Sequence, residues 1–260
     1  MLTLVQHKTA TAHTMIPPNQ HAPFPVGSTR VLALGDCNLF GTHVAPKGSS
    51  ILDKFCRCLE QAGYRVSGQN LACQRACSRE GTALMASSKI QADILLLNYG
   101  HVDSRITPIA RGTYPYITEV GLKTTSRKLL NLKKFRSGNI SPRSVVSGET
   151  LVPIADFCSN IQRMIKFARK ANPGVWILLW GSPPLQHNAQ HNEQLLRYNA
   201  ESHDIATRMG ATYLPTKPVI DNLSFSEELR GKQRFSEVAT TSIAAEMAHA
   251  YLSQRQRTAA

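Results

Sequence analysis

The chain has 260 residues, which is enough for one sizeable domain with its own apolar core. Apolar residues make up 42% of it, well above the disordered regime, and no run of about 18 apolar residues predicts a membrane span. Thirty Lys and Arg against seventeen Asp and Glu give a formal net charge of +13, which favours anionic ligands. The N-terminus lacks the apolar core of a secretory signal, so we expect a cytoplasmic protein.

The six cysteines predict free thiols rather than disulfides or a metal site. A chain of this size without an export signal does not depend on disulfides. Cys56 and Cys58 are separated by one residue, and Cys73 and Cys77 by three, whereas zinc sites favour a spacing of two. We therefore expect no metal and no other cofactor.

The first segment of the chain, residues 1–29, is expected to form an irregular N-terminal arm. Its prolines and histidines are scattered and show no helical or strand period. From residue 30 to residue 260 strand and helix patterns alternate in what we interpret as a single domain. Repeated β-then-α order predicts a three-layer α/β/α architecture with a five-stranded parallel sheet. The expected strands are 31–34, 64–67, 94–97, 175–180 and 211–214, and the expected helices are 50–63, 149–171, 193–209 and 236–253.

A basic insertion at about 120–148 interrupts this pattern after the third strand. It contains no acidic residue, and Phe135 is its only aromatic residue. We expect a solvent-exposed excursion with weak affinity for polyanions. Specific nucleic-acid binding is not favoured, because it needs a recognisable motif or stacking platforms. Its cations are Lys123, Arg127, Lys128, Lys133, Lys134, Arg136 and Arg143.

The most informative segment is the apolar run 31–34 followed by Gly35-Asp36-Cys37-Asn38. Gly-Asp is turn chemistry, so Cys37 is presented just past the carboxyl end of a buried strand. Open α/β sheets place their sites at that edge. Cys37 is therefore the candidate nucleophile of the chain.

This segment resembles the first motif block of the SGNH/GDSL hydrolases, in which a strand is followed by Gly-Asp-Ser. The resemblance implies a flavodoxin-like sheet and places Cys37 at the position of the nucleophilic serine. In the second block of that family a glycine supplies an oxyanion-hole amide, and the matching stretch Asn70-Leu71-Ala72 puts Ala72 at that position. A backbone amide does not depend on the side chain, so this change is tolerable.

The third block of the family reads Gly-x-Asn-Asp, and the matching residues run from Gly100 to Asp103. Val102 stands where the family has its oxyanion asparagine. The stretch is closer to a bacterial branch associated with polysaccharide biosynthesis, which Gly100, Asp103 and Arg105 match, with His101 in place of a glutamate. The Asp103 and Arg105 pair would hold a polar ligand or, alternatively, form a structural salt bridge.

The last block of the family supplies Asp-x-x-His, and its best match is 231–236. Gly231 replaces the aspartate and Arg234 replaces the histidine base. An arginine stays protonated and cannot accept a proton from a nucleophile. The resemblance thus predicts the fold together with a degenerate catalytic site.

Three functions remain open from the sequence. The first is a non-catalytic protein that binds a polar or anionic ligand, such as a glycan or an activated sugar. The second is an esterase or acyltransferase acting on acylated carbohydrate, in which Cys37 works with a relocated base such as His101. The third is a polyanion- or nucleic-acid-associated protein that uses its basic charge. The expected ligand-binding residues are Asp36, Asn38, Gly100, His101, Asp103 and Arg105.

Overall fold

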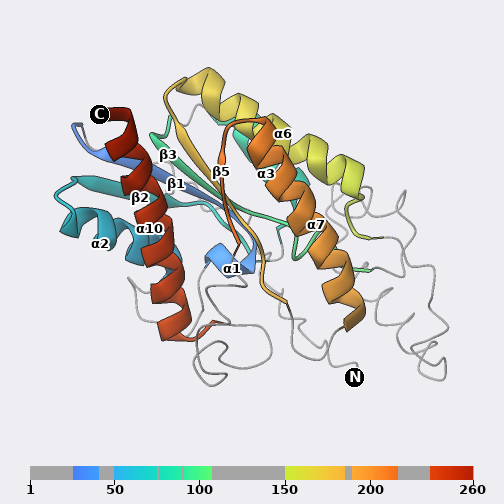
Figure 1. Cartoon of the computed structure of the whole chain (residues 1–260). Coiled ribbons are helices and arrows are strands. Elements are labelled where there is room, and N and C mark those ends of the chain that lie inside the picture. The colour runs from blue at the N-terminus through green and yellow to red at the C-terminus, as the bar shows by residue number, and fades with distance from the viewer. Residues whose placement is uncertain are drawn as a thin grey trace, which may run out of the picture.

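Five parallel strands form one central sheet in the computed structural model of the chain. The structure describes residues 26–40, 50–74, 76–88, 91–106, 150–184, 189–215 and 235–259. The strand order is β2-β1-β3-β4-β5, so β1 lies inside the sheet, as the sequence predicts (Figure 1). All four strand pairs are parallel. The strands are β1 (Thr29–Gly35), β2 (Val66–Asn70), β3 (Ile94–Asn98), β4 (Trp176–Trp180) and β5 (Thr212–Leu214).

Helices cover both faces of the sheet, which confirms the predicted three-layer α/β/α fold. Because successive strand residues point to opposite faces, Leu32 and Leu34 face one helical layer, whereas Val31 and Ala33 face the other. Layers on both sides explain why the central strands are continuous apolar runs. The helices are α1 (Cys37–Phe40), α2 (Ile51–Gln61), α3 (Ser78–Ser87), α6 (Ile154–Ala171), α7 (Ala189–Arg208) and α10 (Glu237–Ala259).

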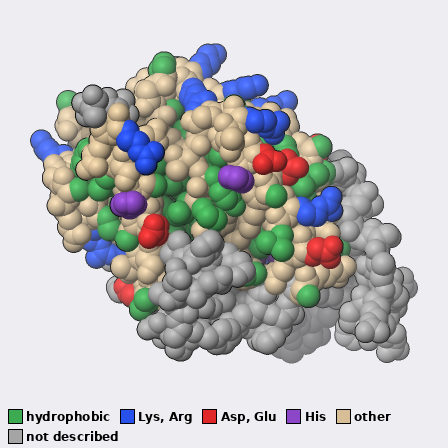
Figure 2. All heavy atoms as spheres, viewed as in Figure 1, with side chains coloured by type: hydrophobic (Ala, Val, Ile, Leu, Met, Phe, Trp, Pro, Cys, Tyr) green, Lys and Arg blue, Asp and Glu red, His purple; other side chains and the backbone are tan. Residues whose placement is uncertain are grey.

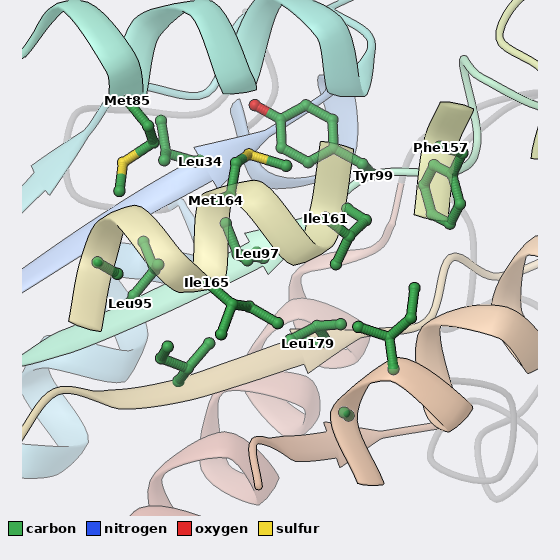
Figure 3. Close-up of a cluster of buried hydrophobic side chains, with 14 of the residues drawn as sticks. Leu34, Met85, Leu95, Leu97, Tyr99, Phe157, Ile161, Met164, Ile165 and Leu179 are labelled. Carbon is green, nitrogen blue, oxygen red and sulfur yellow. The ribbon is translucent and has the colours of Figure 1, made fainter. Parts of the chain in front are cut away.

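One layer packs α3, α6 and α7 on the sheet. Figure 3 shows α6 lying across β1, β3 and β4, with Ile161 and Ile165 turned toward the strands. Leu97 is 1% exposed and Ile165 is fully buried. This arrangement holds the carboxyl end of β3 under α6, where the third motif block begins.

The other layer consists of α2 and α10. Ser50 caps α2 by accepting a hydrogen bond from the amide of Asp53 at 3.1 Å, which completes a capping box. The buried Lys54 ammonium joins the two helices, donating to Glu237 O at 2.9 Å, Thr240 Oγ1 at 2.6 Å and Thr241 Oγ1 at 3.0 Å. This contact fixes the first turn of α10 against α2.

Several element bounds differ from the sequence prediction. The helix expected over 149–171 begins at Ile154, because Leu151 and Val152 instead donate backbone hydrogen bonds to Arg105 and Asp103. Helix α3 is not predicted from the sequence, because Gly81 and a short, weakly amphipathic pattern hide the helical period. Residues 1–25 of the predicted arm and the basic insertion lie outside the described residues. Within the described part, no helix is both long and apolar enough to cross a bilayer.

Candidate functional site

The carboxyl ends of β1, β3 and β4 meet at one edge of the sheet, and Cys37 begins α1 directly after β1. Gly35 allows this close approach, because a Cβ there would lie 2.5 Å from the carbonyl oxygen of Asn98. The amide of Asp36 then donates to the same Asn98 oxygen at 3.0 Å. The predicted position of Cys37, just past a buried strand, is what the structure shows.

Asp36, beside Cys37, is completely buried. Its Oδ1 accepts a hydrogen bond from the amide of Asn38 at 2.9 Å, while its Oδ2 has no partner among the described residues. Burial raises the pKa of Asp36 to about 7, and the charge of Asp103 raises it further, whereas the Asn38 amide and the Arg105 charge lower it. Asp36 is thus protonated for part of the time near neutral pH. Because its side chain is not exposed, Asp36 holds the Asn38 backbone in place and does not itself contact a ligand.

A network of amide side chains braces the same edge. Asn98 Nδ2 donates to Trp180 O at 2.8 Å and to Ser182 Oγ at 3.3 Å, and Asn38 Nδ2 reaches Ser182 Oγ at 3.5 Å. Asn199 of α7 clamps the backbone of Ser182, accepting from its amide at 3.0 Å and donating to its carbonyl at 2.8 Å. The network therefore connects the start of α1 with β3, β4 and α7.

Asn98, Ser182 and Asn199 are not among the site residues expected from the sequence. Asn98 and Ser182 each stand at or just after the end of a buried apolar strand, and that position is a usable signal for a site. Asn199 lies within a long helix, and nothing local marks its function.

The structure places Asp103 and Gly100 within the turn that follows β3. Asp103 is fully buried, and its two oxygens accept from the amides of Ser78 at 2.9 Å and Gly100 at 3.2 Å. No ion pair joins Asp103 to Arg105 among the described residues. Gly100 is also buried and has φ +120°, a conformation that favours glycine. Both residues shape the turn after β3 and are not exposed to a ligand.

His101 is likewise buried, at 3% exposure, and its Nδ1 has no partner in the described part of the chain. Burial lowers the pKa of His101 to about 3, with the charges of Arg105 and His191 acting in the same direction. An imidazole held neutral in this way is a poor base for a thiol. The structure therefore does not favour the Cys37–His101 dyad, or a ligand contact through His101.

A serine–histidine contact lies beside His101, between Ser104 Oγ and His191 Nε2 at 2.9 Å. The same Nε2 lies 3.1 Å from the carbonyl oxygen of His101, which can only accept. Nε2 thus carries the hydrogen, and it cannot also take the hydroxyl proton of Ser104. Both side chains are buried, so this contact fixes α7 on the turn after β3 and is not a catalytic dyad.

The two predicted oxyanion positions, Ala72 and Val102, make contacts inside the protein. The amide of Ala72 donates to Asn70 Oδ1 at 3.0 Å, and the Asn70 side-chain amide donates to Leu39 O at 3.0 Å. The Val102 side chain is 3% exposed and belongs to the core under α3 and α6. Gly231 and Arg234 lie outside the described residues.

Three of the predicted site residues are half-buried at this edge: Cys37, Asn38 and Arg105. No carboxylate of the described residues forms an ion pair with the Arg105 guanidinium. Its positive charge nevertheless acts on this edge, because it lowers the pKa of Asp36, His101 and His191. These three residues provide a thiol, an amide and a cation that forms no ion pair with the described carboxylates.

Comparisons with known proteins show solved structures of similar fold but no significant match by sequence. No family model matches the chain, and no curated protein matches it significantly. A lipase/acylhydrolase from Enterococcus faecalis has a TM-score of 0.57 at 11% identity, covering 85% of this chain and 94% of that one. Est24, a carbohydrate acetylesterase from Sinorhizobium meliloti, has a TM-score of 0.54 at 11% identity, with 87% and 100% covered.

A variant of Axe2, an acetyl-xylooligosaccharide esterase from Geobacillus, has a TM-score of 0.54 at 14% identity, with 87% and 94% covered. These structures span nearly the same length as this chain, so the likeness concerns the whole domain. It confirms, at the level of fold, the likeness that the motif blocks predict. The chain therefore has the α/β fold of the SGNH/GDSL lipases and esterases.

Proposed function

We propose that this protein binds a polar or anionic ligand, such as a glycan or an activated sugar, at the carboxyl edge of its sheet, without serine–histidine hydrolysis. The observation that carries the proposal is Arg105, a half-buried guanidinium without a carboxylate partner among the described residues. A guanidinium in such a place binds carboxylate or phosphate oxygens through two parallel hydrogen bonds.

Neither of the neighbouring acids, Asp36 and Asp103, forms an ion pair with Arg105, although the Arg105 charge acts on Asp36. Burial raises the pKa of Asp36 to about 7 and that of Asp103 to about 6. Near neutral pH Asp36 is about half protonated, whereas Asp103 is mostly ionised and directs its two oxygens at backbone amides. An anionic group of the ligand would supply the missing countercharge.

The residues that stand at the catalytic positions of the similar family also favour binding without hydrolysis. Cys37, Val102 and Arg234 stand where the family has serine, asparagine and histidine, and one lost oxyanion donor alone costs about 10² to 10³ in rate. His101 and His191 both have a lowered pKa, which makes them weak bases. The degenerate site, and its likeness to the branch associated with polysaccharide biosynthesis, are part of this proposal.

A second candidate function rests on the position of Cys37. Its half-buried side chain stands where the family has its nucleophile, and two structurally similar proteins are esterases of acetylated carbohydrates. In an acyl transfer, the Cys37 thiolate would attack the ester carbonyl and form a thioester, releasing the alcohol with a proton from solvent. Water or an acceptor hydroxyl would then take the acyl group and free the thiolate.

Calorimetric titration with UDP-glucose, glucose and inorganic phosphate tests the proposal. We expect binding of UDP-glucose with much weaker binding of glucose, and a loss of about tenfold to a hundredfold in Arg105→Gln, the size of a charged hydrogen bond. Arg197→Gln removes an exposed arginine from α7 and is the control for net charge. Equal affinities of the two variants for UDP-glucose and phosphate would contradict the proposed role of Arg105.

A further inference from the structure

The amino edge of the sheet, opposite the candidate site, carries a second concentration of charge. Each helix that follows a strand runs back across the sheet, so α6, α7 and α10 all end at the amino edge (Figure 1). Basic side chains stand in the last turns of these helices (Arg169, Lys170, Arg208 and Arg257), and Lys166 and Arg255 precede the last turns of α6 and α10. We define the amino-edge surface as Lys166, Arg169, Lys170, Arg208, Arg255 and Arg257.

Hydrogen bonds connect the C-terminal ends of α6 and α10 to residues between the end of α7 and the start of β5. Arg169 Nη2 of α6 donates to Gly210 O, just after α7, at 3.0 Å. Gln254 Oε1 of α10 accepts from Trp176 Nε1 of β4 at 2.8 Å and from Thr212 Oγ1 of β5 at 3.3 Å. The C-terminal ends of α6, α7 and α10, which carry the six cations, therefore lie at one end of the sheet.

These cations face solvent. Five of the six side chains are exposed and Arg169 is half-buried. Figure 2 shows Lys and Arg side chains along the upper edge of the molecule, where Figure 1 places the C-terminal ends of α6 and α7. Asp204, one turn before Arg208, is an exposed carboxylate nearby, and it offsets only part of this charge.

We propose that the amino-edge surface binds the phosphate backbone of a nucleic acid. Its charges extend over three helix ends, which fits a chain of phosphates better than a single small anion. Four of the six cations are arginines, whose planar guanidinium matches phosphate oxygens. The large apolar side chains exposed in the described residues are Val26, Leu196 and Val238, and none of them belongs to this surface, so it offers no side chain for insertion into a bilayer.

Cations at the C-terminal ends of helices also stabilise the helices themselves. Binding must therefore be separated from helix stability and from the high net charge of the chain. The triple variant Arg208→Gln, Arg255→Gln, Arg257→Gln removes three cations from the amino-edge surface. The triple variant Arg57→Gln, Arg79→Gln, Arg197→Gln removes the same charge from α2, α3 and α7, at positions that are not among the six cations of that surface.

The test is fluorescence anisotropy of a labelled DNA duplex of about 20 base pairs, titrated with the full chain at salt from about 50 to about 200 mM. We expect the amino-edge variant to bind about tenfold more weakly than the wild type, with a salt slope lower by about 3. The control variant should retain the wild-type slope within about 1. Thermal unfolding of both variants checks that they remain folded.

Equal losses in the two triple variants would show that only net charge matters, and would overturn the proposal. Vesicles of phosphatidylserine and phosphatidylcholine, at the same salt, provide the second arm. If the amino-edge variant lost vesicle binding while duplex binding stayed unchanged, the partner would be an anionic membrane and the nucleic-acid proposal would be wrong. Loss of duplex binding in the amino-edge variant alone would support it.

Discussion

Asp103 Oδ1 accepts a hydrogen bond from the backbone amide of Ser78 at 2.9 Å, so the carboxyl group that follows β3 anchors the first residue of α3. Asn160 of α6 joins the same contact, donating from Nδ2 to Ser78 Oγ at 2.9 Å. Ser78 and Asp103 are both fully buried. Asp103, which the sequence suggests as a ligand contact, therefore links the end of β3 to α3 and, through Ser78, to α6.

Asp103→Ala should lower the free energy of unfolding by about 2 to 4 kcal/mol, because two buried amides lose their acceptor. Asp103→Asn keeps one acceptor oxygen and should cost less. Asp156→Ala, which removes an exposed carboxylate paired with Arg79, is the control and should cost no more than about 1 kcal/mol. Urea unfolding measures all three. Similar free energies of unfolding for Asp103→Ala and Asp156→Ala would show that the buried hydrogen bonds of Asp103 contribute little to stability.

Asp36 makes the stability depend on pH in a defined direction. Burial raises its pKa from 3.8 to about 7, so between these values the folded state holds a proton that the unfolded state has lost. Stability should therefore fall as the pH rises through this window. Asp36→Asn keeps the Oδ1 acceptor for Asn38 and removes the ionisation, so its melting temperature should exceed that of the wild type at about pH 8.

The measurement for Asp36 is thermal unfolding by circular dichroism from about pH 4 to about pH 8. The difference between wild type and Asp36→Asn should grow with pH. Asp156→Asn serves as the control for the loss of one negative charge at the surface. A constant difference across the range would contradict the assignment of a raised pKa to Asp36.

Lys54→Met should destabilise the protein by about 2 to 4 kcal/mol. The methionine side chain fills the space of the lysine stem, but it leaves Glu237 O and the hydroxyls of Thr240 and Thr241 without their shared donor. The comparison is Lys166→Met on the exposed face of α6, which should be close to neutral. If both variants unfold at the same urea concentration, the Lys54 contact does not hold α10 on α2.

Hydrolysis of p-nitrophenyl acetate by the wild type should be no faster than by Cys37→Ala. The reason is that the described histidines at this edge, His101 and His191, are buried and have a lowered pKa. Cys37→Ser should not gain activity, since a hydroxyl needs a base more than a thiol does. A clear rate in the wild type that disappears in Cys37→Ala would establish Cys37 as a working nucleophile and favour the acyl-transfer function.

Much of the fold follows from local pattern. The runs 94–97 and 175–180 are uninterrupted apolar strands, and such runs predict a parallel sheet with helices on both faces. Strand β2 was predicted at 64–67 and is found at Val66–Asn70, because its polar residues lack a clear period. Helix α3 escaped prediction for a related reason: its pattern is short and carries a glycine.

The chain order of the five strands and of α2, α6, α7 and α10, and the position of Cys37 at the carboxyl edge, follow from the sequence alone, since apolar runs and turn residues act over a few neighbouring positions. Which polar groups are buried, and which partners they have, depends on the tertiary structure. Asp103 meets Ser78 across 25 positions of the chain, Asn98 meets Ser182 across 84, and His191 meets Ser104 across 87. Such contacts depend on how layers pack, and burial then sets the charge of each group, which no local pattern encodes.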